Sequence, residues 1–292
     1  MSTPLVSVIL PTHNRLHFLR DAVASVLAQT ERDFELIIVD DASTDGTKEW
    51  LQQLAGSDSR VRVLRNEQPA GGGGARNRGI EASRGTWVAF LDDDDEWMPG
   101  KLKRQLAELE NHTNAIACAC SFEVHFPSGK TRPFHIPQSV TLRQILSSNV
   151  LGGASVCICS RALLLRIGGF DPRLRSSQDH DLWIRLCKSG NVAVCPEPLV
   201  KYREHDGDRI TRRMDSQLRG ARRVYFKHRR QMERAARRSH VSYLCFVKSC
   251  QPQRGRRSRL RYLALCLRHV PLRTALSLGA RSAPLLIRDL LS

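Results

Sequence analysis

The sequence predicts an α/β protein with a mostly parallel β-sheet flanked by helices. Short runs of Val, Ile, Leu and Phe alternate with stretches whose apolar residues recur every three or four positions. This is the order of strands and crossover helices in a parallel sheet. The apolar runs are continuous, as expected for strands that are buried on both faces. Because the crossovers place parallel strands side by side, their carboxyl ends should meet along one edge.

The elements follow from these patterns in chain order. Strands are expected at residues 6–10, 34–39, 61–66 and 87–91, and extended segments at 115–126, 154–159 and 191–205. Helices are expected at residues 16–29, around Trp50 and Leu54, at about 75–83, at 99–110 and at 178–188. From about residue 212 onward the pattern is helical and rich in arginine, and no internal repeat is evident.

The net charge of +17 is concentrated in the last third of the chain. Residues 201–292 contain 24 Lys and Arg against 6 Asp and Glu, whereas residues 1–200 are nearly neutral. We therefore expect a domain at residues 1–210 and a basic helical extension at residues 211–292. Such an extension fits an anionic membrane surface, or it packs on the domain with a solvated basic face. No nucleic-acid partner is expected, since few aromatic residues stand among the arginines.

Compartment and cysteine usage agree with each other. No run approaches the ~20 apolar residues that span a bilayer, and the N-terminus passes straight into a strand pattern without a signal peptide. We expect a cytoplasmic protein, with peripheral contact at the inner face of the cell membrane if the tail binds lipid. The pairs Cys118/Cys120 and Cys157/Cys159 lack the usual zinc spacing and are expected to be small apolar side chains on strands.

Four consecutive aspartates, residues 92–95, follow the apolar run at 87–91. They would lie at the edge where open α/β sheets bind ligands. Carboxylates this close repel one another unless a cation joins them, and Mg²⁺ or Mn²⁺ prefers oxygen ligands shared with substrate phosphates. We expect a divalent metal held against a nucleotide diphosphate. The alternative is a solvated acidic turn with Asp95 and Glu96 near a helix N-terminus.

Three further motifs stand near the expected strand ends. The loop in VILPTHNR offers backbone donors and a hydroxyl, although an ordinary turn would look the same. In IVDDASTDGT, Asp41 could accept a hydrogen bond from a base or ribose, while the rest fits a turn and a helix cap. The glycines of GGGGARNRG could cradle phosphate, but they lack the Lys-Ser/Thr of a P-loop, and a flexible loop remains open.

Four segments together resemble the family-2 inverting glycosyltransferases with the GT-A fold of nucleotide-diphospho-sugar transferases. They are VSVILPTHNR, FELIIVDDASTDGT, GARNRGIEASRGTWVAFLDDDDEWMPGKL and GGFDPRLRSSQDHDLWIRL. They occur in the family's order over roughly residues 5–210. The resemblance implies metal-dependent transfer of a sugar from a nucleotide-diphosphate sugar, with a UDP-sugar as the donor. The implied acceptor is a hydroxyl of a glycan or lipid-linked glycan in cell-surface polysaccharide biosynthesis.

The resemblance also implies residue roles. Asp179 matches the catalytic base, but Gln178 stands where Glu is common, which makes Asp181 a rival candidate. The metal, Mn²⁺ or Mg²⁺, would be bound by Asp94 and Asp92, with His205 as a further candidate unless it is a surface histidine in a polar loop. The matches to the nucleotide-sugar site are Pro11, Thr12, Asn14, Arg15, Asp41, Arg76, Asp92 and Asp93.

The chemistry explains these residue types. A sugar hydroxyl is a poor nucleophile, so a carboxylate must take its proton during attack on C1. The leaving diphosphate gains charge, which a metal and arginines stabilise. One alternative is a sugar-phosphate nucleotidyltransferase on a similar fold. Such enzymes carry a glycine-rich loop after the first strand, which the segment PTHNR does not match. The other alternative is a non-catalytic protein that binds polyanions through the tail.

Overall fold

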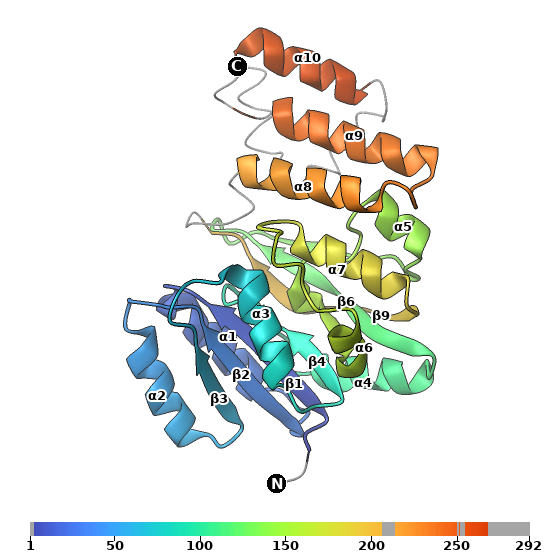
Figure 1. Ribbon diagram of the computed structural model, residues 1–292. Coiled ribbons are helices and arrows are strands. Elements are labelled where there is room, and N and C mark those ends of the chain that lie inside the picture. The colour runs from blue at the N-terminus through green and yellow to red at the C-terminus, as the bar shows by residue number, and fades with distance from the viewer. Residues whose placement is uncertain (1–2, 206–213, 250, 252–254, 268–292) are drawn as a thin grey trace.

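The computed structural model describes residues 3–205, 214–249, 251 and 255–267, and Figure 1 shows one sheet with helices on both faces. The strands are β1 Val6–Thr12, β2 Phe34–Asp40, β3 Val61–Arg65, β4 Trp87–Phe90, β5 Asp95–Trp97, β6 Ala115–His125, β7 Thr131–Phe134, β8 Cys157–Ser160 and β9 Asn191–Arg203. The helices are α1 Leu16–Leu27, α2 Thr47–Ser57, α3 Gly71–Ala82, α4 Lys101–Asn111, α5 Leu142–Ser147, α6 Arg161–Arg166, α7 Gln178–Cys187, α8 Met214–His228, α9 Arg234–Ser249 and α10 Arg256–Leu267, with a 3₁₀ turn, η1, at Ala154–Val156.

The sheet has a parallel half and a mixed half. Its order is β3-β2-β1-β4-β8-β6-β9-β5, and β7 pairs with β6. Strands β1 to β4 pair in parallel, and every residue of β1 and β2 is buried, as their continuous apolar runs predict. Beyond β4, β8 runs antiparallel to both β4 and β6, while β9 is parallel to β6. The α/β class is confirmed, and the antiparallel pairs are an addition that the sequence pattern did not indicate.

Three segments differ from the sequence-based expectation. Residues 154–156, expected in an extended segment, form the 3₁₀ turn η1. Residues 95–97 form β5, which pairs with β9, so they do not begin a helix. Helix α3 begins at Gly71, so the glycine run is the first turn of the helix and not a loop before it. Further along α3, a Cβ on Gly79 would lie 2.4 Å from Cγ2 of Ile9. The absence of a side chain at Gly79 therefore lets α3 lie directly against β1.

The cysteines behave as small core residues. Cys118 and Cys120 on β6, and Cys157 and Cys159 on the neighbouring β8, are buried and free. Burial raises the pKa of the Cys120 thiol to about 12, so it stays a neutral thiol at ordinary pH. The sequence-based interpretation is confirmed for these four residues.

Helices α8, α9 and α10 stack one on another beyond α7 (Figure 1). Helix α9 also packs on α5, where Nε2 of His240 lies 2.9 Å from the carbonyl oxygen of Leu146. In the described part, the tail is helical, as its periodicity predicts. Its division from the preceding domain at residue 210 stays a prediction. Among the described residues, no helix combines the length and the apolar character needed to cross a bilayer.

Candidate active site

The polar ends of β1, β2 and β4 converge at one edge of the sheet. β1 ends at Thr12, whose hydroxyl donates to Oδ2 of Asp93 over 2.9 Å. β2 ends next to Asp41, whose backbone N–H donates to the carbonyl oxygen of Thr12. The loop after β4 carries the four aspartates. The expectation that these loops meet is confirmed, because parallel neighbours in register end at the same level.

Three of the four aspartates form a cluster that could hold a metal ion. Asp92, Asp94 and Asp95 each present a carboxylate oxygen, and these three oxygens lie within 4.8 Å of one another. Asp95 also accepts a hydrogen bond of 2.6 Å from Oγ of Ser155, which fixes its carboxylate. Three oxygen ligands fit Mg²⁺ or Mn²⁺. The run of acids predicts a metal at Asp92 to Asp95, and the resemblance implies Asp94 and Asp92 as ligands. The structure groups Asp95 with these two and leaves Asp93 outside the cluster.

The fourth aspartate, Asp93, turns toward β1 and α1. It accepts hydrogen bonds from Thr12 and from Nη1 of Arg15, the latter over 3.0 Å. Burial raises the pKa of Asp93 to about 6, because desolvation outweighs the attraction of Arg15. The hydrogen bonds of Asp93 thus hold the loop to Thr12 and Arg15, while the other three carboxylates lie close to one another.

Three cationic or ionisable groups surround the acids. Nη1 of Arg15 lies 3.2 Å from Oδ2 of Asp94, and Arg76 forms an ion pair with Asp92. Nε2 of His205 lies 3.0 Å from the same oxygen of Asp94, and the histidine is buried. The interpretation of His205 as a surface histidine in a polar loop is therefore wrong. Its role as a metal or diphosphate ligand stays a prediction.

Arg76 connects the acid cluster to α7. Its Nη1 donates to Oε1 of Gln178 over 3.3 Å, while its Nη2 contacts Asp92. Burial disfavours the charge of Arg76, but the carboxylates of Asp92 and Asp179 outweigh burial and raise its pKa. Asp179, half-buried in the first turn of α7, therefore lies close enough to interact with Arg76 across from the aspartate loop.

Asp181 has a different environment, although only one residue separates it from Asp179. Its carboxylate is fully buried and accepts from Nε of Arg185 at 2.9 Å, Nζ of Lys227 at 2.8 Å and Nε2 of His228 at 2.8 Å. Burial alone would raise its pKa, but the hydrogen bonds from His228 and Lys227 lower it to about 2. Asp181 thus connects α7 to α8, and its three donors and full burial favour Asp179 as the base; the choice between the two stays a prediction.

Asp41 and Asn14 organise the neighbouring loops. The carboxylate of Asp41 accepts from the backbone N–H groups of Ala70 and Gly71, both at 2.8 Å, and so caps α3. Asn14, which follows Pro11 and Thr12 of β1, has a positive φ of 54° and accepts from the backbone N–H of Thr44 at 2.7 Å. Contacts of Asp41 and Asn14 with a nucleotide stay predictions.

Sequence reasoning missed two residues that shape this site. Asn77 on α3 accepts from the backbone N–H of Phe170 at 2.7 Å and donates to its carbonyl oxygen at 2.8 Å. Phe170 lies under Arg76, with the guanidinium carbon 5.2 Å from the ring centroid. Asn77 thus fixes the backbone of Phe170, and the ring of Phe170 packs against the guanidinium of Arg76. The proximity of Asn77 to Arg76 in ARNRG was the available signal.

Comparisons with known proteins place this site in a family. The family model described as "Glycosyl transferase family 2" matches residues 7–167. Over 207 residues the chain is 37% identical to "Putative teichuronic acid biosynthesis glycosyltransferase TuaG" of Bacillus subtilis (strain 168), covering 68% of this chain and 79% of that one. Over 205 residues it is 32% identical to "UDP-Glc:alpha-D-GlcNAc-diphosphoundecaprenol beta-1,3-glucosyltransferase WfgD" of Escherichia coli, covering 70% and 78%.

Solved structures show the same fold at lower identity. S. aureus TarS 1–349 in complex with UDP-GlcNAc matches with a TM-score of 0.69 and 19% identity, over 97% of this chain and 86% of that one. The mannosyltransferase PcManGT from Pyrobaculum calidifontis, in complex with GDP-Man and Mn²⁺, matches with a TM-score of 0.66 and 18% identity, over 100% and 79%. The chain is a glycosyltransferase with the GT-A fold and belongs to glycosyl transferase family 2.

Proposed function

We propose that this glycosyltransferase is metal-dependent and inverting, and that it transfers a sugar from a UDP-sugar to a hydroxyl of a glycan or lipid-linked glycan. The supporting observation is the arrangement of the acids. Asp92, Asp94 and Asp95 form a carboxylate cluster, and Asp179 lies across Arg76 from it on a separate element. One set of acids can thus bind the donor while another acts on the acceptor.

Each residue has a distinct task in this mechanism. Asp92, Asp94 and Asp95 would hold Mn²⁺ or Mg²⁺, which when bound stabilises negative charge on the diphosphate. Arg15 and Arg76 offer further positive charge to the leaving diphosphate. Asp179 takes the proton from the acceptor hydroxyl as it attacks C1. Attack from the face opposite the diphosphate inverts the configuration at C1.

Two relatives support the proposed substrate class. The relative from Bacillus subtilis is named for teichuronic acid biosynthesis, and the one from Escherichia coli for a UDP-Glc donor and a diphosphoundecaprenol-linked acceptor. We extend this class to the present chain: a UDP-sugar donor, a lipid-linked glycan acceptor and a role in cell-surface polysaccharide synthesis. The acceptor lipid would bring the enzyme to the cytoplasmic face of an anionic membrane, which the basic helices fit.

The test separates donor binding from chemistry. UDP binding is measured by calorimetry with and without Mn²⁺, and turnover is measured as hydrolysis or transfer across a panel of nucleotide sugars. Asp94→Asn should abolish the metal-dependent part of UDP binding. Asp179→Asn should keep UDP binding and lower kcat by about 10²-fold or more. Asp33→Asn, which removes an exposed acid remote from the cluster, is the matched control.

Either half of the mechanism can fail separately. Equal UDP affinity with and without metal would remove the proposed metal site. Wild-type turnover in Asp179→Asn would remove the proposed base. Release of pyrophosphate from a nucleoside triphosphate and a sugar phosphate would replace the proposal with nucleotidyl transfer.

A further inference from the structure

The solvent side of α8 and the turn directly after it carry five arginines around one exposed phenylalanine. We call this set the α8 basic face, and its members are Arg219, Arg222, Arg223, Phe226, Arg229 and Arg230. At 3.6 residues per turn, the four members within the helix, which are Arg219, Arg222, Arg223 and Phe226, fall within an arc of about 100°. Arg229 and Arg230 lie in the turn directly after the helix. Phe226 is 53% exposed, and the guanidinium carbon of Arg229 lies 5.1 Å from its ring centroid. The face therefore combines dense positive charge with a central apolar ring.

Helix α9 repeats the same pattern, so the expectation of no internal repeat is wrong for this short segment. The segment RGARRVYF of α8 corresponds to RAARRSHV of α9, fifteen positions later in the chain. In both helices, three exposed arginines are followed by an exposed apolar residue, which is Phe226 in α8 and Val241 in α9. The pattern recurs at exposed positions of two helices, where the side chains do not take part in core packing. It therefore indicates a role in contacts made by the surface.

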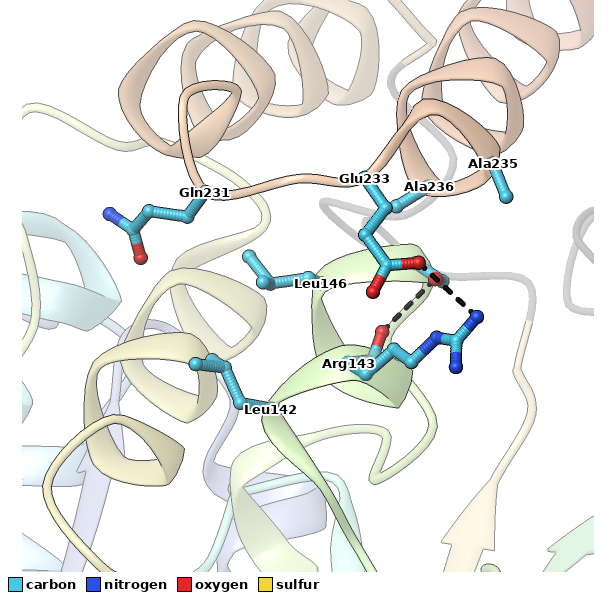
Figure 2. A pocket seen from close by; sticks show the side chains of 8 residues that line it. Leu142, Arg143, Leu146, Gln231, Glu233, Ala235 and Ala236 are labelled. Carbon is cyan, nitrogen blue, oxygen red and sulfur yellow. Dashed lines mark hydrogen bonds and ion pairs between the residues drawn. The ribbon is translucent and has the colours of Figure 1, made fainter.

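The opposite side of α8 provides its packing. Ala221, Val224 and His228 are buried against the rest of the protein. The exposed arginines other than Arg223 are therefore not needed to hold the helix in place. Only two acids occur within residues 214–249, and both have other contacts. Asp215 accepts from Gln251, and Glu233 pairs with Arg143 at the small cavity between α5 and the start of α9 (Figure 2).

The charge of the face is accordingly not neutralised within the described part of the chain. None of its five arginines pairs there with a carboxylate, although Arg223 donates to the carbonyl oxygen of Arg173. Uncompensated arginines in this density raise the local concentration of anions and favour an anionic partner.

The buried side of α8 contacts the loop that leads into α7, the helix that carries Asp179. Oγ of Ser176 donates to the carbonyl oxygen of Ser216 over 2.6 Å, and a Cβ on Gly220 would lie 2.2 Å from the same Oγ. Ser176 stands three residues before Asp179, so the first turns of α8 pack on the segment that leads into the catalytic helix. A surface that binds α8 would therefore contact the helix that packs on the start of α7.

We propose that the α8 basic face binds the anionic headgroups of a lipid bilayer, with the ring of Phe226 inserted at the headgroup boundary. Helices that lie on membranes combine arginine or lysine with an aromatic or leucine side chain in this way. A single-stranded nucleic acid would instead favour several stacked aromatic rings, and the face has one. This inference deepens the membrane contact proposed above, but it does not depend on the catalytic assignment, because binding is measured without turnover.

The first experiment measures co-sedimentation of the full chain with vesicles of phosphatidylcholine, with and without roughly 30 mol% phosphatidylglycerol. The triple variant Arg219→Gln/Arg222→Gln/Arg230→Gln should bind anionic vesicles about 100-fold more weakly than wild type. The matched control, Lys48→Gln/Lys103→Gln/Lys130→Gln, removes three exposed lysines from other surfaces and should bind within a few-fold of wild type.

The second experiment tests insertion of residue 226. Phe226→Ser should weaken binding to anionic vesicles by about tenfold, and Phe226→Trp should show a blue-shifted emission on adding them. Donor hydrolysis without vesicles should be unchanged in the charge variants, which shows that they are folded. Hydrolysis that is absent in wild type as well would count against the proposed function and not against the membrane face.

Three results would overturn the inference. Equal losses in the triple variant and the lysine control would show a non-specific charge effect. Full binding by Phe226→Ser, with no emission shift in Phe226→Trp, would remove the inserted ring. Tighter binding to a single-stranded oligonucleotide than to anionic vesicles, lost in the same triple variant, would assign the face to nucleic acid.

Discussion

Replacing Asp181 by Asn tests how α8 holds the catalytic helix. Asp181 is fully buried and accepts from Arg185, Lys227 and His228, so it connects α7 to α8. Its substitution keeps the shape of the side chain but removes the charge that these donors face. The donors would then remain close together without a neutralising carboxylate, which is the costly way to break a buried ion pair.

The magnitude follows from the pKa. The value for Asp181 falls from 3.8 to about 2, which corresponds to ~2.4 kcal/mol of stabilisation at neutral pH. Repulsion among the remaining cations brings the expected loss to about 3 kcal/mol, at the lower end for such pairs because Asn still accepts hydrogen bonds. An unfolding entropy of ~2.1 cal/mol/K per residue converts this loss into a decrease in Tm of about 5 °C.

The pH dependence gives a sharper test. Because the folded-state pKa is depressed, the stabilisation by Asp181 is fully present above about pH 5 and is lost as the pH falls toward 2. The difference in Tm between wild type and Asp181→Asn should therefore be constant from pH 7 to about pH 5 and then shrink. Circular dichroism melts in a pH series measure this difference, with Asp33→Asn as the exposed control.

Turnover provides an independent readout. Since Asp179 lies in the same helical turn as Asp181, movement of α7 should lower kcat while leaving metal-dependent UDP affinity unchanged. A variant that melts within 1 °C of wild type, on the scale of ~0.6 kcal/mol for a chain of this length, would refute the stabilising role. A loss of UDP affinity equal to the loss of kcat would refute the positioning role.

Three further predictions concern buried contacts beside the site and in the core. Asn77→Ala removes both hydrogen bonds to the backbone of Phe170 and should cost about 2 kcal/mol in urea unfolding and lower kcat, because the ring supports Arg76. Burial lowers the pKa of Lys101, so the folded protein binds its proton less tightly than the unfolded chain does. Wild type should therefore gain stability as the pH rises from 6 toward 10, and the gain in Tm of Lys101→Met over wild type should shrink over the same range. Gly79→Ala should cost about 2 kcal/mol, and adding Ile9→Ala should cost less than the sum of the two single changes, as a double-mutant cycle in urea would show.

Much of the first half of the fold could be predicted from local sequence. The runs VSVIL and FELIIV are continuous and apolar, and both are strands buried throughout. The polar residues that follow them meet because parallel strands in register end together. Strand β5 could not be predicted in this way, since its three residues DEW have no apolar run and are ordered by β9, about a hundred positions later.

The sequence by itself determined the chemical groups of the site. These are four consecutive aspartates after a buried strand, Arg15 in a loop, Arg76 near the start of a helix, and an acid pair at residues 179 and 181. Only the tertiary structure decided which carboxylates act together. Asp95 lies in the cluster as the first residue of β5. Asp181 forms ion pairs with α8, whereas Asp179 lies close to Arg76. The physical reason is that the environment of a charge depends on partners distant in the chain, which local pattern does not place.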